Sequence, residues 1–216
     1  RTLARLAKVV GLSLPGTRGF APEKSVLTGN PVRRAVREVG RRPRELRTRR
    51  LLVMGGSQGA RALNAFLPEI LPALRETGVE IRHQSGLKDE DATRAAYAQA
   101  GYDPACVTAF IDDMAEAYAW ADLALCRSGA STVAELCAAG LPAVLVPFPH
   151  AVHDHQTSNA QVLEKAGAAL LVPEGELRAR ELERVLPQML ADSEGRARMS
   201  RAALDAARPD AAARDM

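Results

Sequence analysis

The chain has 216 residues, enough for one ordinary domain with part of another, and 47% of them are apolar, which suffices for a sizeable core. The charged fraction of 25% and the low counts of Gly (16) and Pro (13) are typical of a globular chain and disfavour disorder. The net charge of +3 is small for this length and aromatic residues make up only 4%, which disfavours nucleic-acid binding. The cysteines (Cys106, Cys126 and Cys137) are odd in number and form no Cys-x-x-Cys pair. This usage argues against a disulfide framework or a thiolate metal site and favours a reducing compartment. No apolar run reaches ~18 residues, so the sequence predicts no membrane-spanning helix.

The first 28 residues are loosely patterned. Apolar residues from Leu3 to Val10 fit either one helical face or a short strand, and the turn-rich stretch 14–24 is typical of a linker. A short apolar run then enters the Gly-Asn-Pro turn at 29–31. The basic stretch 41–50 is interpreted as a solvated connector, with contact to anionic lipid headgroups as the alternative. Because the chain opens with Arg1 rather than Met, we expect a piece of a longer protein.

From residue 50 onward, short apolar runs alternate with amphipathic stretches. This alternation predicts an α/β fold with a parallel sheet covered by helices on both faces. The expected strands are residues 50–56, 79–86, 106–112, 122–129, 142–149 and 168–173. The expected helices are residues 57–77 (one helix or a pair), 89–100, 113–121, 131–139, part of 150–167, and most of the remainder.

The loop "GGSQGA" at residues 55–60 leaves a strand and opens a helix. Its glycines allow a close backbone approach, and a helix N-terminus offers unpaired N–H groups to an anion. The loop lacks both the Gly-x-Gly-x-x-Gly spacing and the lysine of a P-loop, so a plain strand-to-helix turn is an equally good interpretation.

A second unusual loop, "RSGAST" at residues 127–132, also precedes a helix. Arg127 would add a fixed positive charge to that helix N-terminus. Thr132 and Glu135 have the spacing of a capping box, in which the carboxylate bonds the cap residue's N–H. Alternatively, the Glu135 carboxylate accepts hydrogen bonds from two hydroxyls of a ribose. The residues alone favour the capping box.

The third loop, residues 150–160, contains His150, His153 and His155. Their spacing is not that of two histidines one helical turn apart, so we expect no metal ion here. Gln156 and Asn159 are expected to bond a ligand or to cap the next helix. No nucleophile elbow is present, which disfavours a hydrolase.

Taken in order, these loops resemble the C-terminal half of the MurG glycosyltransferase family. The matching stretches span residues 26–170 and include "TGNPVR", "GGSQGARALN", "HQSG", "DHQTSNA", "LEKAGAA" and the long run "FIDDMAEAYAWADLALCRSGASTVAELCAAGLPAVLVPFP". The resemblance implies a Rossmann-like domain, the C-terminal, donor-binding domain of a two-domain GT-B enzyme. Residues 29–216 would form that domain. Residues 1–28 would be the tail of the other domain and the crossover between the two.

The family's nucleotide contacts map onto matching positions of this chain. Arg33 and Ser57 are similar to residues that face the diphosphate. Phe110 and Ile111 correspond to the uracil pocket, where the Ile111 backbone would pair with the base edge and Met114 would lie nearby.

The remaining matches lie on the second and third loops. Glu135 would bind the ribose hydroxyls, Gln156 would hold the sugar with His155 beside it, and Arg127 would support the loop. The residues that would hold the phosphates and ribose at this helix start are Ala130, Ser131, Thr132, Val133, Ala134 and Glu135. We assign no catalytic residue, because the resemblance implies that the general base lies in the family's other domain.

The family transfers N-acetylglucosamine, with inversion, from UDP-N-acetylglucosamine to a lipid-linked muramyl-pentapeptide. The resemblance therefore implies this donor, no cofactor, a lipid-linked acceptor bound through the other domain, and peripheral location at the cytoplasmic side of the bacterial inner membrane. The chain alone would be inactive. Two alternatives stay open: another GT-B enzyme that glycosylates lipids, and a stand-alone nucleotide-binding module.

Overall fold

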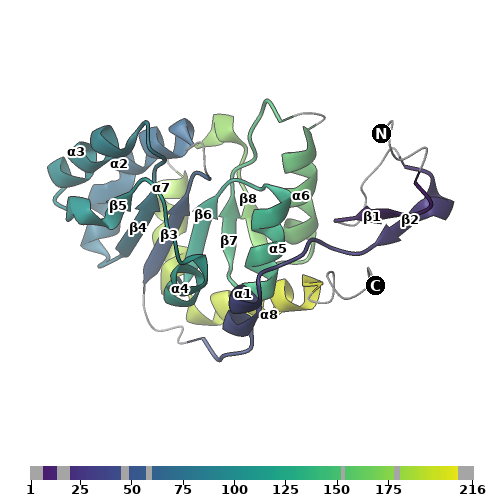
Figure 1. The fold of residues 1–216 in the computed structure, drawn as a ribbon. Helices are drawn as coiled ribbons and strands as arrows, with labels where there is room; N and C mark the ends of the chain where they lie inside the picture. The colour runs from purple at the N-terminus through teal and green to yellow at the C-terminus, as the bar shows by residue number, and fades with distance from the viewer. Residues whose placement is uncertain are drawn as a thin grey trace.

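The computed structural model describes residues 7–13, 20–44, 49–56, 60–151, 154–177 and 181–208. Its centre is a six-stranded, fully parallel sheet with the strand order β5-β4-β3-β6-β7-β8 (Figure 1). The strands are β3 (Arg50–Met54), β4 (Glu80–Gln84), β5 (Val107–Thr108), β6 (Leu123–Cys126), β7 (Ala143–Leu145) and β8 (Ala169–Leu171). The chain winds outward from β3 to β5 and returns to continue at β6, so the strand order reverses between β3 and β6. Open parallel sheets bind ligands at such a switch point.

The predicted α/β architecture is confirmed, and each strand is shorter than its apolar run. The helices are α1 (Arg34–Gly40), α2 (Arg61–Glu76), α3 (Glu90–Gln99), α4 (Met114–Trp120), α5 (Ala130–Ala139), α6 (His155–Lys165), α7 (Glu181–Ala191) and α8 (Ser193–Ala206). Single turns of 3₁₀-helix are η2 (Pro22–Lys24), η3 (Pro104–Cys106) and η5 (Glu174–Glu176). Helix α1 was not predicted, because its seven residues are too few to show a helical period.

The region 57–77 contains one helix rather than a pair. Helix α2 continues through Pro68 and Pro72, although each proline lacks the N–H that a helix interior needs. The two prolines are spaced by four residues, Pro68 partly buried and Pro72 exposed, so both rings lie on one side of the helix. The opposite side of α2 is buried in the core, and this packing keeps the helix continuous.

Alternate residues of the central strands pack into two cores. Leu51 and Val53 of β3 face the cluster built with α2 and α7. Leu52 and Met54 face the cluster built with α1, α4, α5 and α8. Figure 1 views the sheet from the side of α1, α4 and α5. Both faces of the sheet are therefore covered, as the continuous apolar runs predict.

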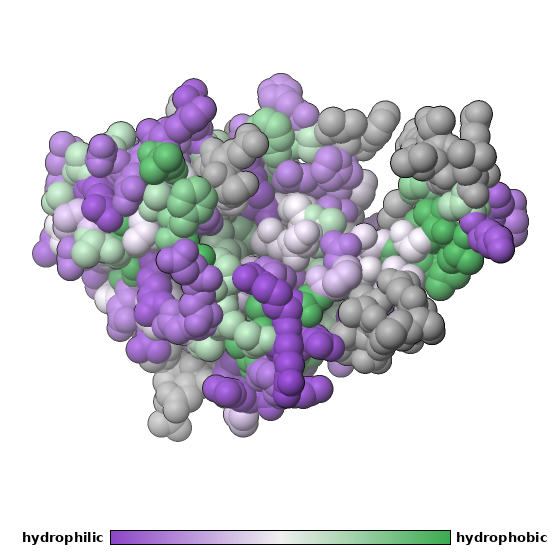
Figure 2. Space-filling model, viewed as in Figure 1, coloured by the Kyte–Doolittle hydropathy of each residue, from purple (hydrophilic) through white to green (hydrophobic). Residues whose placement is uncertain are grey.

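Strands β1 (Val10–Leu12) and β2 (Ser25–Leu27) form a separate parallel pair that projects from the body of the molecule (Figure 1). Of the two alternatives left open for residues 3–10, the structure shows a short strand beginning at Val10, while Leu3 and Leu6 lie outside the described residues. Val9 and Val26 are 61% and 46% exposed, and Figure 2 shows this apolar surface. Two strands alone bury too little apolar area for independent stability.

Arg44 corrects the interpretation of 41–50 as a solvated connector. Its guanidinium donates to the carbonyl oxygens of Tyr118 (3.0 Å), Ala121 (2.7 Å) and Ala139 (2.8 Å), at the C-terminal ends of α4 and α5. Burial lowers the pKa of Arg44 to about 10, so it stays protonated at neutral pH. Arg41 and Arg42 are exposed, as predicted, and residues 45–48 lie outside the described part of the chain. A cation at the negative ends of two helix dipoles stabilises both.

Within the described residues, no helix is both long and apolar enough to cross a membrane.

Candidate functional site

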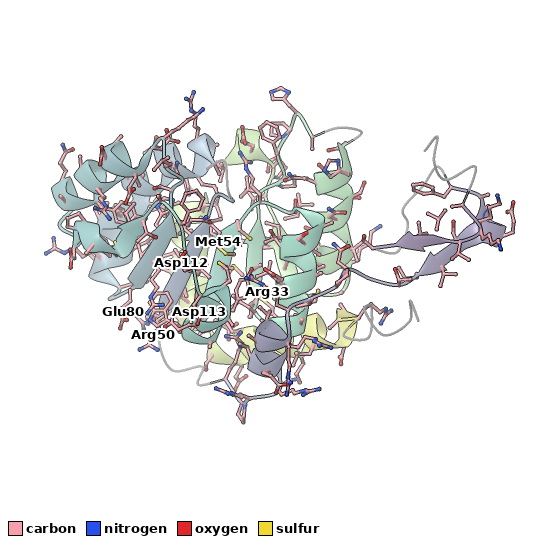
Figure 3. All side chains as sticks on the ribbon, in the orientation of Figure 1. Arg33, Arg50, Met54, Glu80, Asp112 and Asp113 are labelled. Carbon is pink, nitrogen blue, oxygen red and sulfur yellow. The ribbon has the colours of Figure 1, made fainter. Side chains whose placement is uncertain are left out.

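The unusual loops all follow neighbouring strands at the carboxyl edge of the sheet. In Figure 3, Arg50 and Glu80 are labelled where β3 and β4 begin, and Met54 where β3 ends. The loop after β3 contains Gly55, Gly56 and Ala60, while Ser57 lies outside the described residues. The loops after β6 and β7 lead into α5 and α6. Because β3, β6 and β7 are adjacent, their loops meet at the switch point.

Hydrogen bonds join the loops after β6 and β7. The Ser128 hydroxyl donates to the Gln156 carbonyl (2.8 Å), and the Asn159 amide donates to the Ser128 carbonyl (2.9 Å). The Gln156 side-chain oxygen accepts from the Phe148 N–H (3.0 Å). Asn159 is thus bound within the protein, whereas the Gln156 amide nitrogen retains two donors for another partner. Ser128 is fully buried, and its role in linking the two loops could not be inferred from sequence, because serine is common in loops of any kind.

Arg127 is paired inside the protein. Its guanidinium donates to the carbonyl oxygens of Val146 and Pro147, both at 3.2 Å, and forms an ion pair with Glu174 of η5. Only 14% of the side chain is exposed. The positive charge expected from Arg127 is therefore compensated by Glu174, and its contacts tie β7 and η5 to the end of β6.

The capping-box interpretation of Thr132 and Glu135 is wrong. Helix α5 begins at Ala130 after Gly129, which makes no side-chain cap, so Thr132 already lies within the first helical turn. The Glu135 carboxylate instead accepts from the Tyr118 hydroxyl (Oε2, 2.9 Å) and from the Arg33 guanidinium (Oε1, 3.1 Å). The first N–H groups of α5 have no partner within the helix, as at any α-helix start, and they favour an anion.

Arg33, which donates to this carboxylate, also lines a cavity of about 300 Å³. The cavity lies between the first turns of α1 and α4, and Figure 3 labels three of its lining residues, Arg33, Asp112 and Asp113. Asp113 also caps α4 by accepting from the Glu116 N–H at 2.9 Å. The complete lining is Arg33, Ala35, Val36, Asp112, Asp113, Met114 and Ala115.

Polar groups behind the first loop form a buried chain. His83 of β4 is fully buried, with Nδ1 3.0 Å from the Tyr97 hydroxyl and Nε2 3.0 Å from the Asn64 side-chain oxygen. The Asn64 amide donates to the Ser85 carbonyl and to the Asp89 carboxylate, both at 2.9 Å. Asn64 belongs to the first turns of α2, so this series of hydrogen bonds links that helix to the loop after β4. Burial lowers the pKa of His83 to about 4.

Among the residues expected from the sequence, Arg33 and Met114 line one cavity, and Glu135 is joined to it through its hydrogen bond from Arg33. Phe110 is 50% exposed on the loop before α4, next to the partly buried Ile111.

The other residues expected from the sequence that the structure describes do not line this cavity. The Val133 side chain is fully buried, and its N–H donates to the Gly129 carbonyl (2.9 Å). Ser131 and His155 are exposed in the first turns of α5 and α6. Ala130, Thr132 and Ala134 are partly buried along α5. Within the described residues, no group of three or more potential ligands could hold a metal ion.

Tyr118 is the main site residue that sequence reasoning missed. It occupies an apolar stretch of α4, where a buried tyrosine is indistinguishable from a core residue until its hydroxyl is seen on Glu135. The only signal was the tyrosine type itself, because a buried phenol generally has a hydrogen-bond partner.

Comparisons with known proteins add sequence and structural relatives. Residues 50–214 match the glycosyltransferase family 28 C-terminal domain. Two curated relatives bear the name UDP-N-acetylglucosamine–N-acetylmuramyl-(pentapeptide) pyrophosphoryl-undecaprenol N-acetylglucosamine transferase. The one from Nitratidesulfovibrio vulgaris (strain DP4) is 51% identical over 99% of this chain, and the one from Xanthomonas campestris pv. campestris (strain 8004) is 50% identical over 99%. This chain spans 60% and 50% of their lengths.

Among solved structures, Acinetobacter baumannii MurG is similar, with a TM-score of 0.71 and 38% identity. The match covers 99% of this chain and 60% of that one. The calicheamicin glycosyltransferase CalG4 is also similar, with a TM-score of 0.62 and 22% identity, covering 96% of this chain and 52% of that one. At this identity the second likeness concerns the fold alone.

Proposed function

The chain belongs to glycosyltransferase family 28, and on this premise we propose that it is the part of a MurG-type enzyme that binds UDP-N-acetylglucosamine. The complete enzyme would transfer N-acetylglucosamine to a lipid-linked muramyl-pentapeptide. The observation that carries the proposal is the Glu135 carboxylate, held on α5 by Tyr118 and by the cavity-lining Arg33, in a chain half identical to named transferases.

The cavity, together with Glu135, the start of α5 and the loop before α4, would offer one chemical group for each part of a uridine diphosphate. A carboxylate accepts two hydrogen bonds at once, which suits the two adjacent hydroxyls of a ribose. The first N–H groups of α5 and the Arg33 guanidinium are suited to the diphosphate. The backbone around Ile111, on the loop before α4, would pair with the edge of the uracil. Phe110 and Met114 would supply apolar contacts for the base.

Cleavage of the bond between sugar and phosphate places negative charge on the departing UDP. Donors already aimed at that charge stabilise it without reorganisation, and one well-placed donor contributes about 3–4 kcal/mol. The α5 amides are such donors, because the packing of Leu136 and Val133 fixes the helix against the sheet. We assign no general base to the described residues and place it in the part of the enzyme that this chain does not span.

The sugar would contact the loop after β7. The Gln156 amide nitrogen, whose partner oxygen is already fixed by Phe148, would donate to a sugar hydroxyl. His155 would lie beside it, and Ser57 would contact the diphosphate. Arg127 would act indirectly, through the loop that it supports. The lipid-linked acceptor and a peripheral attachment to the cytoplasmic face of the membrane belong to the complete enzyme.

Calorimetric titration with UDP-N-acetylglucosamine, UDP and ADP tests the donor assignment. We expect the two uridine nucleotides to bind and ADP not to bind. Glu135→Gln should weaken UDP binding about tenfold or more, because the neutral amide replaces one acceptor by a donor. Glu116→Gln is the matched control, since Glu116 is an exposed carboxylate paired with Arg82 and should leave UDP affinity unchanged. Equal affinity for ADP and UDP would contradict the proposal.

The acceptor is tested by supplying a separately expressed N-terminal half of a close relative. We expect restored transfer of N-acetylglucosamine to the lipid-linked muramyl-pentapeptide. Transfer to a different lipid acceptor would favour another enzyme that glycosylates lipids. Nucleotide binding with no transfer to any acceptor would favour a stand-alone binding module.

A further inference from the structure

The two oxygens of the Glu135 carboxylate have very different partners. Oε2 accepts from the Tyr118 hydroxyl at 2.9 Å, and Tyr118 is only 1% exposed. Oε1 accepts from Arg33 at 3.1 Å, and the Arg33 side chain is 58% exposed. One oxygen is thus held by a buried neutral group and the other by a solvated cation.

The Tyr118 contact is expected to be persistent. Tyr118 lies on α4 within the apolar cluster that also contains Ala117 and Leu136, so its ring cannot move without disturbing the core. A buried hydroxyl without a partner costs free energy, and a hydrogen bond to a charged acceptor is stronger than one between neutral groups. Burial and the neighbouring Glu135 carboxylate also raise the pKa of Tyr118 far above its usual value, so the phenol remains a proton donor.

The Arg33 contact is expected to be exchangeable. Exposed ion pairs contribute little to stability, because solvent screens the charges and long side chains lose freedom when paired. Arg33 precedes α1 and makes no side-chain cap to that helix, and it also lines the cavity. A small movement would therefore carry its guanidinium from the carboxylate toward a ligand in the cavity.

We propose that Tyr118 is a positioning residue that orients the Glu135 carboxylate toward the ribose, and that Arg33 is a partner that the ribose displaces. Each carboxylate oxygen has two lone pairs, so Oε2 can accept from a ribose hydroxyl while it keeps its bond from the buried Tyr118. The partner of Oε1 is the exposed Arg33, which can leave as the second ribose hydroxyl approaches. The released guanidinium would then be available to the diphosphate. This inference rests on the proposed function, because it assumes that a ribose binds at Glu135.

The Tyr118 part is tested with two ligands that differ only in the ribose hydroxyls. UDP and 2′,3′-dideoxyuridine diphosphate are titrated into the chain and into its Tyr118→Phe variant. We expect the original chain to bind UDP more tightly than the dideoxy ligand. In the variant the ratio of the two affinities should fall about tenfold, because UDP binding weakens while binding of the dideoxy ligand changes little. A purely structural defect would weaken both ligands equally. Tyr102→Phe is the control, because the Tyr102 hydroxyl donates to the Val79 carbonyl at 3.2 Å, outside the cavity lining.

The Arg33 part is tested by Arg33→Met, a change at an exposed residue that should leave the fold intact. If the ribose displaces Arg33, the variant should affect the affinities for uridine and for UDP differently. Binding of uridine, which has no phosphate, should be unchanged or a few-fold tighter because no ion pair must break, while UDP binding should weaken about tenfold. Equal weakening of uridine and UDP would refute displacement.

These outcomes separate the inference from the proposed function. If the original chain binds no UDP, both are refuted. If it binds UDP and Tyr118→Phe keeps the full preference over the dideoxy ligand, the positioning role alone is refuted. A Tyr118→Phe variant that does not fold leaves the Arg33→Met titrations to decide whether Arg33 is displaced at Glu135.

Discussion

The buried His83 makes the stability of this domain depend on pH in a predictable direction. Its imidazole is fully buried, and desolvation lowers its pKa from an ordinary 6.5 to about 4. The Asn64 amide donates to Ser85 and Asp89, so its oxygen must accept from Nε2–H, which leaves Nδ1 to accept from Tyr97. The neutral imidazole with its proton on Nε2 therefore satisfies both partners. A second proton on Nδ1 would remove the acceptor of the Tyr97 hydroxyl.

The sign follows from which state binds the proton. As pH falls below about 6.5, the unfolded chain protonates at His83 while the folded chain does not, so the unfolded state is favoured. Stability is fully present above the unfolded pKa and is lost progressively as pH falls toward 4. One pKa unit corresponds to 1.36 kcal/mol, so His83 should remove about 2 kcal/mol by pH 5 and about 3 kcal/mol below pH 4.

Urea denaturation at pH 7.5 and pH 5.0 measures this loss. The quantity compared is the change in unfolding free energy between the two pH values, in the original chain and in His83→Gln. The variant should be less stable at pH 7.5 and should lose about 2 kcal/mol less on acidification, because glutamine does not titrate. His155→Gln, at an exposed histidine, is the matched control and should lose as much as the original chain. An equal loss in His83→Gln and the original chain would refute the reasoning.

Two further substitutions test the packing that supports the site. In the same denaturation assay, Arg44→Met should lower the free energy of unfolding by about 2–4 kcal/mol, because three helix-end carbonyls lose a charged donor. Arg41→Met, at an exposed arginine, is the control and should lower it by less than about 1 kcal/mol. Gly40→Ala should cost about 1–3 kcal/mol, since the added Cβ would lie 2.1 Å from the Ala138 carbonyl oxygen, whereas Gly175→Ala meets nothing within 4 Å and should be nearly neutral. Similar thermal midpoints for both glycine variants would show that α1 and α5 can separate without cost.

Much of the fold was predictable from the sequence because its determinants are local. Uninterrupted apolar runs such as residues 51–54 can be satisfied only by strands covered on both faces. Turn-forming residues after each run mark the carboxyl edge of the sheet, so the loops after β3, β6 and β7 are recognisable without knowledge of the strand order. Helix α1 was missed because it depends on close packing against α5 rather than on its own periodicity.

The site required tertiary structure because its decisive contacts join residues far apart in the chain. Glu135 has the sequence spacing of a local cap, yet its partners are Tyr118, 17 residues earlier, and Arg33, 102 residues earlier. The charge of Arg127 is compensated by Glu174, 47 positions later. By itself the sequence determined the strands of the main sheet, most of the helices and which loops share an edge, since apolar patterning and turn chemistry act over a few residues. Only the packed fold decided which charges pair, because burial leaves a polar group the partners that the topology brings within reach.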